Sequence, residues 1–140
     1  HGLGGNIDAG PHTATASIVS GPGSFVGSPT CTYTGGAATA SCQVTITSAT
    51  PGVTVVQATS DIPVNGQTIT RTTGTAVNTA AGGSGNATKT WVNANIQITP
   101  ANATNAVGTN HVLTITVNAL GGTIDAGPHT ATASIVSGPG

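Results

Sequence analysis

Apolar and polar residues alternate with period two along several short stretches of the chain. Leu113, Ile115 and Val117 alternate with threonines, and Val44 and Ile46 do the same earlier in the sequence. This spacing puts apolar side chains on one face of a β-strand and polar side chains on the other. No stretch has a convincing helical period. Further strand-like stretches, rich in β-branched residues, are 13–19, 30–33, 53–58, 68–71 and 96–99.

Turn-forming residues separate these stretches. Glycine and proline at 21–23 and at 48–52 interrupt the strand pattern, and Asn65-Gly66 is a pair that favours a two-residue hairpin turn. Many short strands divided in this way are typical of two antiparallel sheets packed face to face. The sequence therefore predicts an all-β fold, an antiparallel β-sandwich.

One segment of the chain occurs twice. Residues 4–23 read GGNIDAGPHTATASIVSGPG, and residues 121–140 repeat them with Thr123 in place of Asn6. The copies stand 117 positions apart, which is a comfortable size for one sandwich and indicates a tandem array. A sandwich has one position for a given strand. We therefore expect residues 12–19 and 129–136 to occupy equivalent positions in two successive sandwiches of a longer repeating object.

The two cysteines flank a stretch that predicts a hairpin around Gly36-Ala37. In the register centred on that turn, Cys31 lies directly opposite Cys42, at a distance that a disulfide can span. Cys42 shares its parity with Val44, so the disulfide is expected to face the core. The alternative is a pair of small buried thiols. A disulfide would indicate an oxidising compartment outside the cytoplasm.

Charged residues are scarce in this chain. They make up 4% of the sequence, the net charge is −1, and apolar residues reach 36%. We therefore expect no basic surface for nucleic acid or anionic lipid, and the chain is too apolar for a disordered segment. No apolar run approaches the length of a membrane span. The charged residues are Asp8, Asp61, Arg71, Lys89 and Asp125.

The later part of the chain carries a family resemblance. Residues 98–117, ITPANATNAVGTNHVLTITV, resemble the first two strands of bacterial immunoglobulin-like (Big-type) tandem repeats of large secreted or cell-surface proteins. Residues 12–25, 31–47 and 51–59 resemble the middle and closing strands of such repeats. The resemblance rests on patterns of Thr, Val and Gly. It therefore implies an immunoglobulin-like antiparallel β-sandwich and says little about activity.

The matching strands occur in permuted order, so the chain is expected to cross from one repeat into the next. Residues 1–62 would supply the later strands of one repeat, and residues 93–140 the opening strands of the following one. Residues 63–92 contain a hairpin turn and a Gly/Ser-rich stretch, and are expected to form the junction. Each sandwich then needs strands from the preceding segment, whether the repeats are continuous or separate chains.

The sequence predicts no catalytic, cofactor-binding or metal site. The acidic residues are too few for a catalytic carboxylate pair, and no nucleophile-elbow motif is present. Asp8 and His12, joined by His111, offer the ligands of a weak metal site, but a structural role for a histidine after a proline turn is the interpretation we adopt. A copper-binding amino terminus at His1 is a further alternative.

Other residues point to modification or packing. Asn86 and Asn102 each stand two residues before a threonine, which matches the acceptor pattern for N-glycosylation. Chance matches are the alternative in a chain so rich in Asn and Thr. Lys89 is a candidate for an isopeptide crosslink with an asparagine, of the kind found in some surface adhesins. Such crosslinks need a buried acid, and Asp61 is the sole unrepeated candidate for it. Trp91 is expected to pack inside the sandwich or at the junction.

Taken together, the duplication and the composition predict a structural protein. We expect a subunit or repeat of an extracellular filament or cell-surface stalk, whose partner is itself, either as a homopolymer or as successive tandem repeats. The alternative is an adhesin-type binding module that recognises a glycan or host protein. The shortage of ionisable groups argues against an enzyme.

Overall fold

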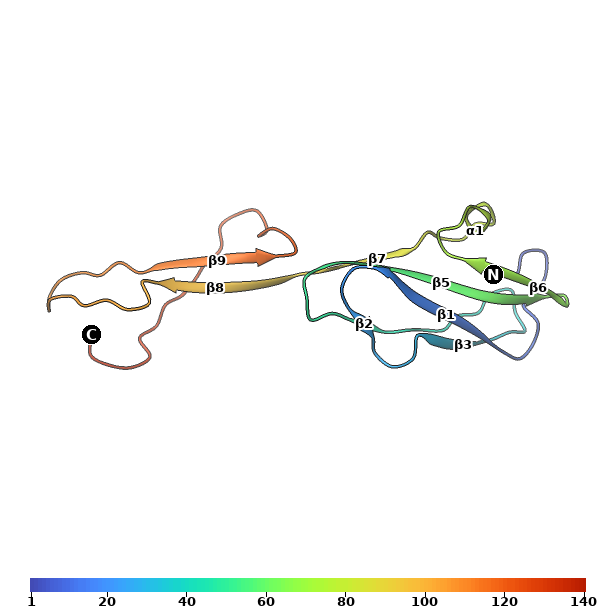
Figure 1. The fold of residues 1–140 in the computed structure, drawn as a ribbon, viewed down its shortest axis with the longest axis horizontal. Helices are drawn as coiled ribbons and strands as arrows, with labels where there is room; N and C mark the ends of the chain where they lie inside the picture. The colour runs from blue at the N-terminus through green and yellow to red at the C-terminus, as the bar shows by residue number, and fades with distance from the viewer. The chain divides into compact units, whose positions relative to one another are not determined.

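A computed structural model describes residues 1–140 and confirms the predicted all-β fold. Most of the ordered elements are strands, and every strand pair is antiparallel. The chain forms two compact units, His1–Trp91 (unit 1) and Val92–Gly140 (unit 2) (Figure 1). The boundary between the units therefore falls at the end of the stretch that was expected to be a junction.

Unit 1 is built on a five-stranded sheet in the order β3-β1-β5-β6, in which β7 also pairs with β5. The central strand β1 lies between β3 and β5. Because β6 pairs with residues 59–64 of β5 and β7 with residues 52–56, these two strands follow one another along the same edge of β5. The five strands are β1 (Pro11–Ser20), β3 (Thr30–Thr34), β5 (Gly52–Val64), β6 (Gln67–Thr72) and β7 (Ala87–Trp91).

The two faces of this sheet differ in chemistry, because successive side chains of a strand point to opposite faces. The outer face is lined by hydroxyl groups, among them those of Thr13, Thr15 and Thr59. The opposite face is largely apolar and is called the inner face. Direct cross-strand pairing assigns to it His12, Ala14, Ala16, Ile18, Cys31, Tyr33, Val56, Ala58, Ser60, Ile62, Ile69 and Arg71.

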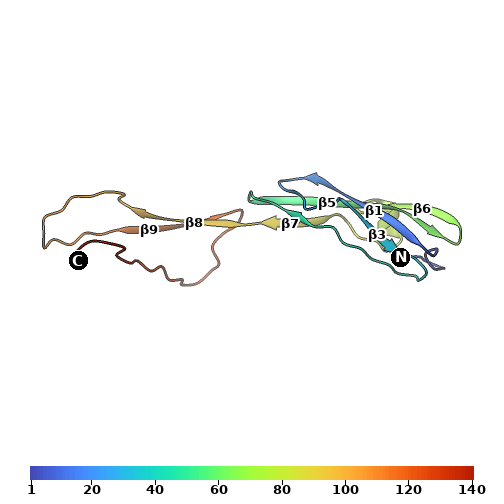
Figure 2. The ribbon, with the colours of Figure 1, turned by 90° about the horizontal axis from the view of Figure 1, so that it is seen from below.

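A partial second layer covers the inner face. Residues 35–45 leave β3 and run along one side of the sheet without pairing to it (Figure 2). They lead into a two-stranded ladder of β2 (Ser24–Phe25) and β4 (Ile46–Thr47). Along this covering stretch, Cys42 and Val44 are half-buried while their neighbours are exposed, as their parity predicts.

The core between these layers is small. Its buried hydrophobic side chains are Ile7, Ala16, Tyr33 and Val64. Ile7 lies on the amino-terminal segment and forms an isolated bridge with Val64 at the end of β5. An open hollow of about 280 Å³ remains between the inner face and the covering stretch. The second layer of unit 1 therefore does not fill the space above the sheet.

Two hairpins predicted from turn residues have different outcomes. The β5–β6 hairpin at Asn65-Gly66 is confirmed, with φ angles of 50° and 75° at these residues and Val64 paired with Gln67. The hairpin around Gly36-Ala37 is wrong. Gly36 N–H donates instead to the carbonyl of Ile7 at 2.8 Å, and β3 pairs with β1. The backbone groups after β3 thus bond to the amino-terminal segment, and not to residues 39–42 as the predicted hairpin required.

Of residues 63–92, which were expected to form the junction, all but Val92 belong to unit 1, where they contribute two strands and a short helix. The helix α1 (Ala76–Ala80) was not predicted. Thr75 is its N-cap, and the Thr75 side chain accepts a hydrogen bond from Asn78 N–H. Between β6 and β7, residues 73–86 leave the sheet as an excursion. Thr73 holds the two ends of this excursion together through hydrogen bonds. Thr73 N–H donates to the carbonyl of Ala58 at 2.9 Å, and its hydroxyl donates to Asn86 at 2.8 Å.

Unit 2 consists of one hairpin and the second copy of the duplicated segment. The hairpin strands are β8 (Asn93–Thr99) and β9 (Thr114–Leu120). Within the single chain, residues 129–136 do not form the expected strand, and no residue after Leu120 lies in one. The physical reason is the lack of a partner: the chain contains one β3 and one β5, and the first copy already lies between them.

Candidate functional site

The β8–β9 hairpin has an apolar face that unit 2 leaves open. Ile96 is 65% exposed, Ile98 is 51% exposed and Val117 is 49% exposed. A contiguous apolar surface of this kind is a candidate interaction site. Its members are the directly paired residues Ala94 and Ala119, Ile96 and Val117, and Ile98 and Ile115. The opposite face carries only polar side chains apart from Leu120, namely Asn93, Asn95, Gln97, Thr99, Thr114, Thr116 and Asn118.

The second copy of the duplicated segment keeps the local conformation of the first. Gly10 and Gly127 both have a φ of 105°. The imidazole Nε2 of His129 lies 2.8 Å from the carbonyl oxygen of Asp125, and the first copy has the same contact at 2.7 Å. The first copy is flanked by strands and the second is not. These local features therefore come from the segment itself and do not need strand partners.

The second copy lies beside the apolar face of the hairpin. A hollow of about 240 Å³ is lined by Ile96, Ile98 and Ile115 of the hairpin and by residues 132–134 of the second copy. Ala133 is the counterpart of Ala16, which is buried on the inner face of unit 1. The equivalent of a core residue of unit 1 thus lies near the hairpin in unit 2.

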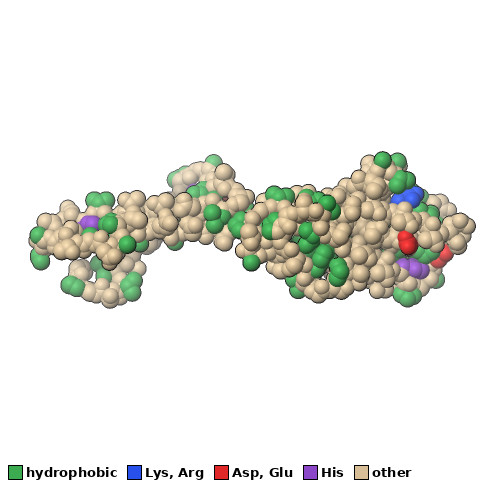
Figure 3. All heavy atoms as spheres, in the orientation of Figure 1, with side chains coloured by type: hydrophobic (Ala, Val, Ile, Leu, Met, Phe, Trp, Pro, Cys, Tyr) green, Lys and Arg blue, Asp and Glu red, His purple; other side chains and the backbone are tan.

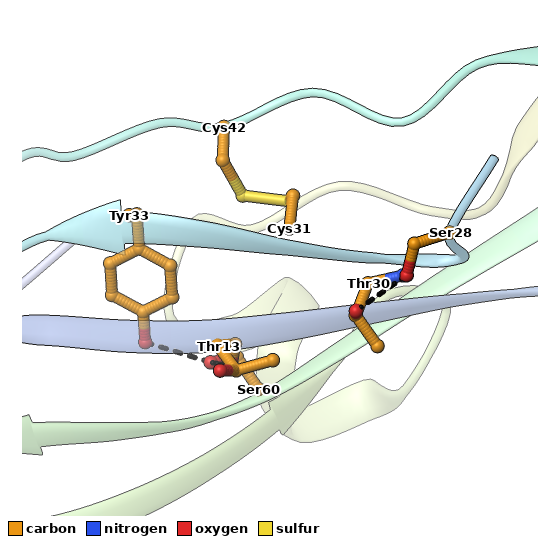
Figure 4. The surroundings of a disulfide bond; sticks show 7 residues. All are labelled: Thr13, Ser28, Thr30, Cys31, Tyr33, Cys42 and Ser60. Atoms are coloured by element: carbon orange, nitrogen blue, oxygen red, sulfur yellow. Dashed lines mark hydrogen bonds between the residues drawn. A yellow bond between two sulfur atoms is a disulfide. The ribbon is translucent and has the colours of Figure 1, made fainter.

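The disulfide between Cys31 and Cys42 is confirmed, with a Cα–Cα distance of 5.7 Å (Figure 4). It joins β3 to the covering stretch, and not to a paired strand as the predicted hairpin required. No free cysteine remains. The disulfide therefore fastens the partial second layer to the sheet at a place where no backbone ladder connects them.

A polar cluster crosses the sheet next to this disulfide. The Tyr33 hydroxyl lies 2.7 Å from the Ser60 hydroxyl, which donates to the carbonyl oxygen of Thr13 at 2.8 Å (Figure 4). The ring of His12 lies 5.6 Å from that of Tyr33. Tyr33 is buried, and its hydroxyl satisfies the hydrogen-bonding needs that burial creates. This cluster ties β3, β1 and β5 together, and sequence reasoning missed it.

The residues considered for a metal site take part in the fold. His12 Nε2 contacts the backbone carbonyl of Asp8, and the Asp8 carboxylate accepts a hydrogen bond from Gly66 N–H at 3.0 Å. His1 Nδ1 lies 2.9 Å from the hydroxyl of Thr39, and His111 is exposed in the β8–β9 loop. No group of three or more His, Cys, Asp or Glu side chains is arranged to hold a metal ion.

Trp91, the last residue of β7, makes a polar contact within unit 1. Its Nε1 donates to the hydroxyl of Thr54 at 2.9 Å, and Thr54 is fully buried and donates in turn to the carbonyl of Pro22. The Lys89 ammonium lies 5.3 Å from the centroid of the Trp91 ring. The Asp61 carboxylate accepts from the Thr70 hydroxyl. Lys89 and Asp61 thus have separate partners, and the predicted core position of Trp91 is a half-buried one.

Replacing Trp91 by phenylalanine is expected to lower the free energy of unfolding of unit 1 by about 1 kcal/mol, because the hydroxyl of buried Thr54 loses its donor. Urea denaturation followed by far-UV circular dichroism measures the change. Lys89→Gln is the matched control, since it removes the cation above the ring and keeps the hydrogen bond. Equal effects of the two substitutions would contradict the role assigned to the indole N–H.

The two glycosylation candidates differ in accessibility. Asn86 is half-buried at the start of β7, and its side chain accepts the hydrogen bond from Thr73. Asn102 is exposed in the loop between β8 and β9. Glycosylation stays a prediction at both positions, and Asn102 has the freer side chain.

The surface of the chain carries few charged groups, and no known protein identifies its function. Charged atoms are sparse on the face drawn in Figure 3, as the composition requires. The helix α1 is too short to cross a membrane, and the chain has no other helix. No protein-family model, curated protein or solved structure matches this chain.

Proposed function

We propose that this chain is a structural subunit or repeat of an extracellular filament or cell-surface stalk, and that its partner is another copy of the same sequence. The observation that carries the proposal is the second copy of β1. Residues 121–140 keep local features of the first copy but have no strand partners. In unit 1 the same sequence lies between β3 and β5 and pairs along both edges. A β3–β5 environment that is not filled by its own first copy, as in a successive repeat or after exchange of strands between copies, would satisfy its backbone in the same way.

The unit of this assembly, in our proposal, is an immunoglobulin-like β-sandwich of the bacterial Big type, built from strands of two successive repeats. The partial second layer of unit 1 and the open apolar face of the β8–β9 hairpin support this composition. The scarcity of charge also supports self-association, because little electrostatic repulsion opposes the contact between copies.

The proposed location is outside the cell or on its surface. The disulfide between Cys31 and Cys42 supports it, since such bonds persist in oxidising compartments. The adhesin-type alternative depends on aromatic side chains at the surface. Tyr33 is buried, and Phe25 and Trp91 are half-buried, so no observation favours recognition of a glycan or host protein. A mechanical role needs none of these groups to be exposed.

Negative-stain electron microscopy of the full chain under oxidising conditions is the test of this proposal. We expect fibres whose length increases with protein concentration. Ala133→Asp should abolish them, because a carboxylate would enter the position that Ala16 occupies in the core of unit 1. The matched control is Thr132→Asp, which corresponds to the exposed Thr15 and should leave the fibres intact. Discrete particles at every concentration would overturn the proposal.

A further inference from the structure

The inner face of unit 1 is incompletely covered on the side of β5. Ala58 is exposed although it lies directly beside the buried Ala16 in the sheet register. Ile62 and Ile69, which pair with one another further along the sheet, are only half-buried. The covering stretch and its disulfide lie on the side of β3. An apolar sheet face is thus closed at one side and open at the other.

The β8–β9 hairpin has the complementary properties. Its apolar face is exposed in unit 2, it is two strands wide, and none of its residues is charged. The inner face of unit 1 carries two charged residues, Arg71 on β6 and Lys89 on β7, both along the edge that these strands form. Docking of the two surfaces therefore removes little water from charged groups. It also buries apolar area of both surfaces, which is favourable.

Unit 2 provides a template for the contact. In it, Ala133 and its neighbours face Ile96, Ile98 and Ile115 across a small hollow. The counterpart of Ala133 in unit 1, Ala16, lies on the inner face and lines the hollow above it. Ala16 and Ala133, the same position of the duplicated segment, therefore each border a hollow. In unit 2 the other wall of that hollow is the hairpin.

We infer that the apolar face of the β8–β9 hairpin of one copy covers the inner face of unit 1 of a second copy and completes its second layer. This inference rests on the proposed function and names the partner surface within it. The occupant is the hairpin and no other apolar segment, because it is the hairpin that stands opposite the duplicated segment in unit 2. Ile98 then lies over the region of Ala16 and Ala58.

Disulfide crosslinking between two variants, each with one added cysteine, tests this contact. Each variant has one reactive thiol, since Cys31 and Cys42 are bonded to one another. Ala58→Cys and Ile98→Cys are mixed under mild oxidation, and the heterodimer is measured on a non-reducing gel. We expect about tenfold more heterodimer than in the control mixtures, because docking raises the effective concentration of the two thiols.

The controls move each thiol to the opposite face of its sheet. Thr59→Cys replaces Ala58→Cys on the outer face, and Thr116→Cys replaces Ile98→Cys on the polar face of the hairpin. Both control positions are exposed, so a lack of crosslinking does not come from a buried thiol. Equal yields in all mixtures, or an Ile98→Cys homodimer in place of the heterodimer, would overturn the inference.

Microscopy of the unmodified chain separates this result from the proposed function. Fibres together with the heterodimer support both statements. Fibres without the heterodimer keep the proposed function and overturn the inference. The heterodimer without fibres keeps the contact between hairpin and inner face and overturns the filament. The absence of both overturns both.

Discussion

Replacing Cys31 and Cys42 together by serine is expected to lower the free energy of unfolding of unit 1 by about 3 kcal/mol. The disulfide closes a loop with a sequence separation of 11 residues, and its removal enlarges the conformational freedom of the unfolded chain. The loss also frees the covering stretch, which has no backbone ladder to β3. Urea denaturation followed through Trp91, the sole tryptophan, measures the effect within unit 1.

Reduction of the unmodified protein is the control for this double substitution. A reductant should bring its stability close to that of the serine variant and leave the variant unchanged. A difference between reduced protein and variant would show that the substituted side chains, and not the crosslink, cause the loss. If the serine variant or the reduced protein were as stable as the oxidised protein, the role assigned to the disulfide would be contradicted.

Gly21→Ala is expected to destabilise unit 1 by about 3 kcal/mol or more, since its φ of 90° disfavours any side chain and the added Cβ would clash with the Val53 carbonyl oxygen. The chain offers a matched control in the second copy. Gly138 has a φ of 94° and nothing within 4 Å of an added Cβ. Gly138→Ala should therefore leave the denaturation curve of unit 1 unchanged.

The same pair of variants reports on assembly. If the second copy enters a β1 position in another copy of the chain, Gly138 meets the clash that Gly21 has in unit 1. We then expect Gly138→Ala to lose fibres while its unit 1 remains fully stable. Fibre formation by Gly138→Ala at the normal concentration would contradict the insertion of this segment, and equal destabilisation by both variants would contradict the packing argument.

The sequence predicts several strands correctly from local patterns, although the alternation around Val44 yields only the two-residue strand β4. The stretch 13–19 lies within β1 and 68–71 within β6, and Asn65-Gly66 forms its turn because both residues accept positive φ angles. The burial parity of Cys42 and Val44 is also correct. These features depend on neighbours in the sequence, so local patterns are sufficient to find them.

Pairing partners are harder to predict, because they depend on segments far apart in the chain. Cys31 and Cys42 were correctly paired, yet the hairpin that motivated the pairing does not exist. The amino-terminal segment around Ile7 takes the backbone groups of Gly35 and Gly36 instead. The cluster of Tyr33, Ser60 and the Thr13 carbonyl was not predicted for the same reason. It joins three strands that only the fold brings together.

The single edge that β6 and β7 form along β5 has a consequence for how copies of the chain meet. An exposed strand edge is a template for uncontrolled sheet growth. This edge is divided by the excursion that Thr73 closes, and it carries both basic residues of the chain, Arg71 on β6 and Lys89 on β7. Charge and a break in the ladder both discourage a further strand from adding there. In a protein otherwise almost free of charge, both features favour the proposed end-to-end assembly over sideways growth of the sheet.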